Sequence, residues 1–226
     1  AATGKFELLK AQGDYPGTNY SDILEYVPGL KKAVFIRTQQ NRANVWEYDA
    51  QANTWSKRSP KGPAPPFGID ASACLDLKRN RIYFGGGYYP VAPGSNAFWC
   101  YDVKTNAWVD LQPKGKTCGG SNRYGPNMAV MNYDAVNDVV VLFYHGDPAV
   151  NPDQEKGRGL YVYDPVANAW GEAPLALPKE VCIAGQSGLQ INGFYSAELN
   201  VHFSHAATDS TDNGTMWVYR YKKSAK

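Results

Sequence analysis

A ten-residue pattern of aromatic residues, Asp and Asn occurs three times in this chain and restricts its fold more than any other feature. Each copy has two aromatic residues two positions apart, then Asp, then Asn four positions later, and ends in Trp; the copies are Trp46–Trp55, Trp99–Trp108 and Tyr161–Trp170. Alternating aromatic residues place two rings on one face of a β-strand, and Asp and Asn side chains bond to nearby backbone in turns. Each copy therefore predicts a β-hairpin.

The spacing of the copies predicts the architecture. A degraded fourth copy begins at Trp217, so the first positions fall at residues 46, 99, 161 and 217, which are 53, 62 and 56 residues apart. A period of about fifty residues with four strands in each unit is typical of a β-propeller. No stretch of useful length has apolar residues at helical spacing. We therefore predict an all-β fold, a four-bladed β-propeller of four-stranded antiparallel blades.

The predicted blades form a single domain, residues 1–226. They cover residues 21–60, 69–113, 126–174, and 188–226 together with 5–11. The last blade needs the N-terminal strand because the chain ends before a fourth closing Trp, while Phe6–Leu9 is similar to the outer strand that opens at Trp108. We predict that residues 5–11 pair antiparallel with Met216–Tyr221 and close the ring, since an open blade leaves an unpaired edge.

Composition disfavours several classes of partner. The net charge is +2, so no strong field favours nucleic acid. No run approaches the roughly 18 apolar residues of a membrane-spanning helix. We expect a monomer that binds neither nucleic acid nor a membrane. The small residues Ala1–Thr3 fit the product of signal-peptide cleavage, which would make the protein secreted or periplasmic, and equally fit a trimmed chain.

The four cysteines are compatible with a disulfide but do not require one. Cys100 stands in a predicted strand, where we expect a buried thiol. Cys118 and Cys182 lie in the connections that lead into the third and fourth blades. A bridge between these two cysteines and a pair of free thiols are both open alternatives.

The chain resembles the kelch-type propellers, including the central domain of galactose-oxidase-like proteins. The resemblance is carried by a Gly doublet that ends a strand, by Tyr-Asp pairs that enter a hairpin and by Trp residues that close it: Gly85-Gly86; Tyr48-Asp49, Tyr101-Asp102 and Tyr163-Asp164; Trp55, Trp108 and Trp170. One blade keeps the Gly doublet, and the chain has fewer blades than is usual in that family. The resemblance implies no single activity, because kelch-type propellers include oxidases, lyases, isomerases, lectins and adaptors. No motif supplies copper chemistry, and we predict no cofactor.

Recognition is expected on the face of the propeller that carries the long loops, because turn chemistry alone explains the short-turn face. A Phe near the end of each second strand serves to align the blades: Phe35, Phe84, Phe143 and Phe203. Two positions later stand the members of a predicted ring: Arg37, Gly86, His145 and His205. Such a ring suits an acidic ligand, a metal held by two imidazoles, or a base beside a charge-neutralising Arg. The alternative is that each His only bonds to a neighbouring loop.

Further side chains on the same face suit sugars or a protein partner. They are three aromatic rings and a guanidinium: Tyr88, Tyr89, Arg123 and Tyr124. Aromatic rings stack on sugars and, with Arg, are enriched where proteins bind one another. With the ring above, they form the predicted ligand-binding set. We predict no metal site beyond the weak candidates His145 and His205.

Three functions compete on these observations. The first is a binding module that recognises a carbohydrate or protein ligand on the long-loop face. The second is an enzyme acting on an acidic polysaccharide or a similar substrate. Its catalytic candidates are Arg37 to neutralise a carboxylate, His145 or His205 as base, and Tyr144 or Tyr124 as acid. The third is a structural or assembly propeller. We rank the binding module first because no strong catalytic motif is present.

Overall fold

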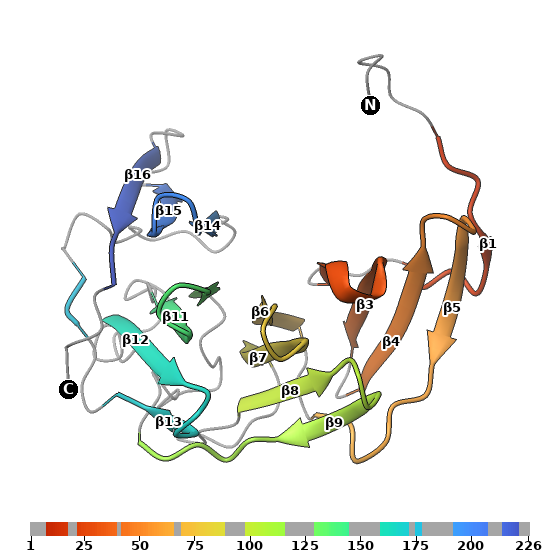
Figure 1. Ribbon diagram of the computed structural model, residues 1–226, viewed down its shortest axis with the longest axis horizontal. Coiled ribbons are helices and arrows are strands. Elements are labelled where there is room, and N and C mark those ends of the chain that lie inside the picture. The colour runs from red at the N-terminus through yellow and green to blue at the C-terminus, as the bar shows by residue number, and fades with distance from the viewer. Residues whose placement is uncertain are drawn as a thin grey trace.

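The computed structural model describes residues 8–17, 22–39, 42–65, 69–88, 98–115, 129–144, 159–171, 175–177, 192–207 and 214–221. Within these residues the strands form four separate sheets, and no α-helix occurs. The sheets stand around a common centre with their first strands innermost (Figure 1). None of the described residues belongs to a helix long and apolar enough to cross a membrane.

The four sheets follow one another along the chain. The first sheet has the order β1–β5–β4–β3–β2, from β1 (Gln12–Gly13), β2 (Ile23–Val27), β3 (Lys32–Gln39), β4 (Arg42–Asp49) and β5 (Thr54–Arg58). The second contains β6 (Ile69–Asp76), β7 (Arg81–Tyr88), β8 (Phe98–Asp102) and β9 (Ala107–Asp110). The third contains β10 (Ala129–Asp134), β11 (Val139–Tyr144), β12 (Gly159–Asp164) and β13 (Ala169–Trp170). The fourth contains β14 (Asn192–Ser196), β15 (Val201–Ala207) and β16 (Gly214–Tyr219).

The three aromatic hairpins predicted from the repeat are confirmed as β4–β5, β8–β9 and β12–β13. In each, the Tyr hydroxyl donates a hydrogen bond of 2.8 Å to Oδ1 of the repeated Asn, which has a positive φ; the pairs are Tyr48–Asn53, Tyr101–Asn106 and Tyr163–Asn168. Asn tolerates the left-handed conformation better than most residues. The repeated residues therefore form the turn and hold the ring beside it.

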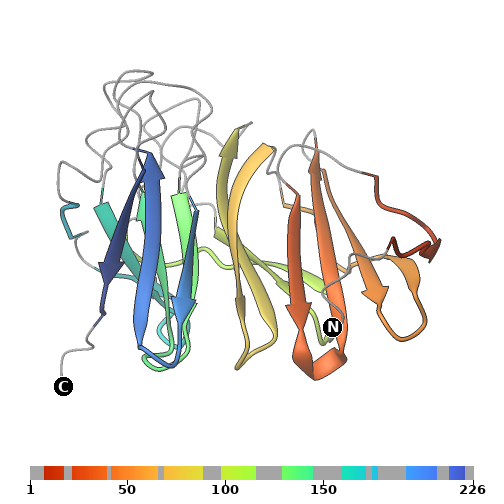
Figure 2. The same cartoon turned by 90° about the horizontal axis from the view of Figure 1, so that it is seen from above.

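The hairpins between first and second strands also turn at one residue with positive φ. These left-handed turn residues are Lys31, Asn80, Asp138 and Asn200. The first sheet adds a short 3₁₀ turn, Pro28–Leu30, before Lys31. Figure 2 shows the β2–β3, β6–β7 and β14–β15 hairpins turning at the same edge of the molecule. That edge is the predicted short-turn face.

A short lead-in segment runs beside the outermost strand of the sheet that follows it. β1 pairs parallel with β5, and bridges of the same kind join Lys61 to Ala107 and Lys114 to Ala169. Each lead-in contains a Gly with positive φ. At Gly13, where φ is 85°, a Cβ would lie 2.1 Å from the backbone oxygen of Trp55. Only glycine fits there without a shift of the backbone.

The predicted closure of the ring is not found among the described residues. There β16 pairs with β15 alone, and Leu8 and Leu9 are exposed and belong to no strand. Lys10 is held by the first sheet, since Asn53 Nδ2 donates to its backbone oxygen at 3.2 Å. Lys10 and Ala11 lead into β1 as Ser59 and Pro60 lead into Lys61, and no pairing of Lys10 or Ala11 with β16 is found among the described residues. Residues 5–7 lie outside the described residues.

Apolar side chains fill the spaces between neighbouring sheets. One buried cluster joins the first and second sheets, a second joins the second and third, and a third includes Tyr219 of the last sheet. Val139, Val140 and Val141 are buried, as is typical of a strand covered on both faces. Cys100 is fully buried and carries a free thiol, as expected; Cys118 and Cys182 lie outside the described residues. Sheet packing thus fixes the inner strands relative to one another.

Candidate ligand-binding cavity

The described part of the chain contains some of the residues predicted for the long-loop face. Arg37 lies on β3 and donates through Nη1 to the backbone oxygen of Pro16 at 3.0 Å. Tyr144 ends β11 and is buried, His205 lies partly buried on β15, and Tyr88 ends β7. The remaining predicted residues lie outside the described residues: Tyr89, Arg123, Tyr124 and His145.

Strand register corrects the predicted ring. Counted from the left-handed turn residue of each hairpin, the positions level with Arg37 are Gly86, Tyr144 and Ala206. His205 stands one position earlier, level with Ile36. Because successive side chains point to opposite faces of a strand, a slip of one residue moves a side chain to the other face. The alignment on Phe was therefore wrong in the last two blades, and Arg37 and His205 do not occupy one ring.

The same count reveals a different ring on the inner strands. Glu25, Cys74, Asn132 and Phe194 each stand six residues before the left-handed turn residue of their hairpin. Their partners on the second strands are also equivalent: Val34, Tyr83, Val141 and Phe203. One residue from each sheet thus lies at one level of the centre. We call these four residues the inner ring.

The inner ring lines a cavity of about 540 Å³. Turn residues from all four first hairpins line it too, which places it at the short-turn end of the centre: Pro28, Leu77, Ala135 and Ala197. Tyr26 and Phe194 also line it and are 57% and 56% exposed, so the cavity is open to solvent. Its volume lies within the range of small-molecule sites, roughly 300–1,000 Å³.

The polar groups of the inner ring have few partners. Burial raises the pKa of Glu25 to about 7, and none of the described lining residues is Lys, Arg or His. Burial, and then the nearby Glu25 and Asp76 carboxylates, raise the pKa of the Cys74 thiol well above its usual value, so the thiol is neutral. Asn132 is 7% exposed, and its Nδ2 is buried without a hydrogen-bond partner.

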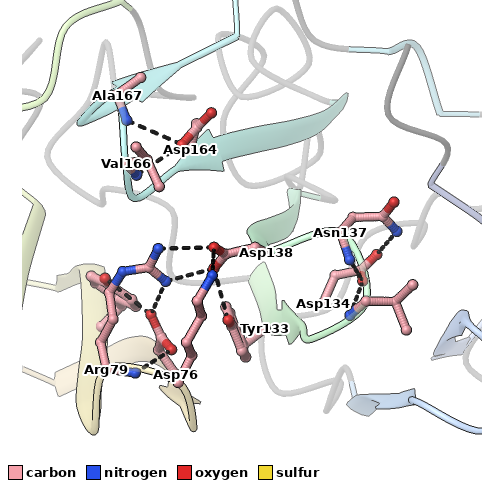
Figure 3. A network of polar contacts seen from close by, with 12 residues as sticks. Asp76, Arg79, Tyr133, Asp134, Asn137, Asp138, Asp164, Val166 and Ala167 are labelled. Carbon is pink, nitrogen blue, oxygen red and sulfur yellow. Dashed lines mark hydrogen bonds and ion pairs between the residues drawn. The ribbon is translucent and has the colours of Figure 1, made fainter. Parts of the chain in front are cut away.

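The carboxylates at the turns beside the cavity, in contrast, accept hydrogen bonds from neighbouring side chains and backbone (Figure 3). Asp76 is completely buried and accepts from Arg79 Nη1 at 2.8 Å. The same guanidinium binds both oxygens of Asp138, at 2.6 and 3.0 Å, and Tyr133 donates to Asp138 at 2.8 Å. The pKa of Asp138 is lowered, chiefly by Arg79. This network joins the second sheet to the third.

Asp134 stabilises the β10–β11 turn of the third sheet as Asp76 stabilises the β6–β7 turn, by accepting a backbone hydrogen bond from the residue three positions later. Its Oδ1 accepts from the backbone N–H of Asn137 at 2.8 Å, and its Oδ2 lies 3.3 Å from Nε2 of the buried His202. Burial lowers the pKa of His202, although Asp134 opposes the shift. This pair holds the third and fourth sheets together. No group of three or more His, Cys, Asp or Glu suited to a metal occurs among the residues that the structure describes.

No protein-family model matches this chain, and no curated protein sequence matches it. Solved structures do resemble it. TolB from Acinetobacter baumannii superposes with a TM-score of 0.53 at 12% identity, over 88% of this chain and 41% of that one. Hydrazine synthase of Kuenenia stuttgartiensis gives a TM-score of 0.51 at 12% identity, over 88% of this chain and 50% of that one. This chain spans half or less of the length of each.

The likeness at this level of identity concerns the fold alone. Together with antiparallel sheets that stand around a centre, it identifies the architecture as a β-propeller. The sequence period had predicted this class from the aromatic hairpins. The chemistry of the site has to come from the residues of this chain.

Proposed function

We propose that this protein is a binding module that recognises a carbohydrate or protein ligand. The observation that carries the proposal is the solvent-open cavity of about 540 Å³, with aromatic walls and an inner ring in which the Asn132 side-chain nitrogen lacks a hydrogen-bond partner. Rings such as Tyr26 and Phe194 stack on sugars, and carboxyl and amide groups bind hydroxyls. Unpaired polar groups in a cavity cost stability, and a ligand that pairs with them recovers that cost.

The long-loop face remains a second proposed recognition surface, with Arg37, Tyr88 and His205 as its described members. The enzyme alternative stays tied to Arg37, Tyr144 and the histidines. Register weakens it, because it separates the Arg and His that were expected to act together. The structural or assembly role needs no cavity at all.

Binding experiments distinguish these sites. Glycan arrays and pull-downs should identify a ligand of the wild-type protein. Tyr26→Ala and Phe194→Ala should each weaken its binding by about tenfold or more. Tyr15→Ala is the matched control, because Tyr15 is a similarly exposed ring at the periphery and packs against Trp55. If Arg37→Ala abolishes binding and the two cavity variants do not, the site is on the long-loop face.

The finer architecture is part of the same proposal: a kelch-type ring of four blades in one domain, closed by the segment around Phe6. Support comes from the lead-ins. Asn53, Asn106 and Asn168 hold Lys10, Ser59 and Leu111 in the same way, at 3.2, 3.1 and 2.7 Å. Ser59 and Leu111 directly follow an outer strand, and by analogy we propose that an outer strand precedes Lys10.

Deletion of residues 1–9 tests the closure. If these residues cover the edge of β16, their loss should lower the melting temperature by about 5–10 °C, because it removes several kcal/mol of strand pairing. Replacement of Leu8 and Leu9 by Ser is the milder variant. An unchanged melting temperature in both would show that the first and last sheets are not joined by this segment.

A further inference from the structure

The Glu25 carboxyl group is partly desolvated and has no positively charged partner among the described residues. Glu25 is partly buried, and the fully buried acidic side chains of the described residues have one or more partners each. Glu47 is bound by Lys32 at 3.3 Å and by Arg58 at 3.4 Å, and Asp102 is bound by Arg81 at 3.0 Å. For Glu25 burial is the one cause of the pKa shift, and no cation opposes it. The charged form of Glu25 therefore lacks the partner that this protein provides elsewhere.

The groups that face Glu25 are neutral or acidic. From β6 comes the neutral Cys74 thiol, whose pKa is raised by burial and then by Glu25 and Asp76. Tyr195 and Tyr133 of the cavity wall stay protonated at neutral pH, since burial raises the pKa of Tyr195 to about 12 and also raises that of Tyr133. On β3, Glu25 is paired with Val34, which has no charge. A cationic ligand that enters the cavity would therefore meet no positively charged side chain among the described lining residues.

Aromatic rings complete that environment. Tyr26 and Phe194 line the same cavity and are more than half exposed. The face of an aromatic ring attracts a cation, and sites for quaternary ammonium groups combine such rings with an acidic residue. Asn132 adds a neutral amide for hydrogen bonds to a ligand.

We propose that the cavity binds a small organic cation through its ammonium group, with the Glu25 carboxylate as counter-charge and Phe194, which stands level with Glu25 in the inner ring, as the aromatic wall. The inference rests on the proposed function and specifies its ligand. A sugar ligand would carry an amino group, and a protein ligand would present an amine. The Cys74 thiol is uncharged and therefore does not attract the cation.

Choline and its uncharged isostere 3,3-dimethyl-1-butanol test this directly. The two probes share shape and hydroxyl and differ in charge, and the charge of choline does not depend on pH. Titration followed by NMR shifts of the cavity residues at about pH 8 should show choline binding about tenfold or more tighter than the alcohol. Glu25→Gln should remove that preference and leave binding of the alcohol unchanged. Glu198→Gln is the matched control, because Glu198 is an exposed carboxylate in the β14–β15 turn.

The pH dependence supplies a second readout. Choline affinity of the wild type should rise between about pH 5.5 and pH 8 as Glu25 ionises, and the affinity of Glu25→Gln should stay flat. Equal binding of choline and the alcohol, or no effect of Glu25→Gln, overturns the cation site and leaves the binding module intact. If choline fails to bind while an array ligand binds in a Tyr26-dependent way, the cation site is again rejected alone. If the folded protein binds none of these at the cavity, both proposals fail.

Discussion

Glu47 and Glu25 lie in the same sheet and flank the same residue of β3, Val34, but their electrostatic surroundings differ. Glu47 is 5% exposed on β4 and holds two cations. Glu25 stands on the innermost strand, and burial raises its pKa to about 7. In the described structure Glu47 thus has two cationic partners, whereas Glu25 on the inner strand has none. A charge that the scaffold does not balance indicates a site that balances it with a ligand.

The largest loss of stability is expected when the Asp76–Arg79–Asp138 ion-pair network is broken. Arg79→Ala leaves Asp76, which is fully buried, without its cation and also removes one of the two cations that bind Asp138. Removal of one partner from a buried ion pair typically costs about 3–5 kcal/mol. Urea unfolding should show a loss of that size. Lys78→Ala is the control, since the Lys78 side chain is 63% exposed and its pair with Asp138 contributes less than about 1 kcal/mol. Equal losses for the two variants would contradict this account of the network.

Glu25→Gln should have the opposite sign and depend on pH. The pKa of Glu25 in the folded protein, about 7, lies above its value in the unfolded chain. The stabilisation from the bound proton is therefore full below about pH 4, and it is lost as pH rises through 7. Gln cannot ionise, so the variant should exceed the wild type by about 2–3 kcal/mol at pH 8 and match it near pH 4. Thermal unfolding at the two pH values measures the difference. A variant that is less stable at pH 8 would show that Glu25 has a hidden partner.

A smaller effect is expected from the repeated turn. Tyr48→Phe removes the hydroxyl that donates to Asn53 at 2.8 Å and leaves the ring in place. The loss of one such hydrogen bond should cost about 1 kcal/mol. Chemical denaturation of Tyr48→Phe and of Tyr15→Phe gives the comparison, because the Tyr15 side chain is largely exposed. If both variants unfold alike, the Tyr–Asn contact does not hold the turn.

The aromatic hairpins could be predicted because each is specified within ten residues. Tyr48 and Asn53 meet across one turn, and the turn needs nothing from the rest of the chain. The inner ring could not be predicted in this way. Its members come from four sheets and become equivalent only when the register of each hairpin is known. Glu25 in isolation is an ordinary strand residue, although its place among Ile23, Tyr26 and Val27 was a usable signal.

The predicted histidine ring failed for a related reason. Phe143 and Phe203 were taken as equivalent because they are the same residue type, but Phe143 stands five residues after its turn residue and Phe203 three, against four for Phe35 and Phe84. A core accepts Phe at different levels of a strand. The left-handed turn residue is a better reference, since backbone geometry fixes it. Counted from Asp138 and Asn200, the two Phe residues stand at different levels.

The charge state of Glu25 in the intact protein is the measurement that tests the comparison most directly. A titration of the Glu25 carboxyl by ¹³C NMR, assigned with Glu25→Gln, should give a pKa of about 7 in the free protein and a lower value in the presence of choline. A pKa in the ordinary range of glutamate, about 4–5, that choline does not change would contradict the account. It would mean that the centre of this propeller, like its periphery, already balances its charge.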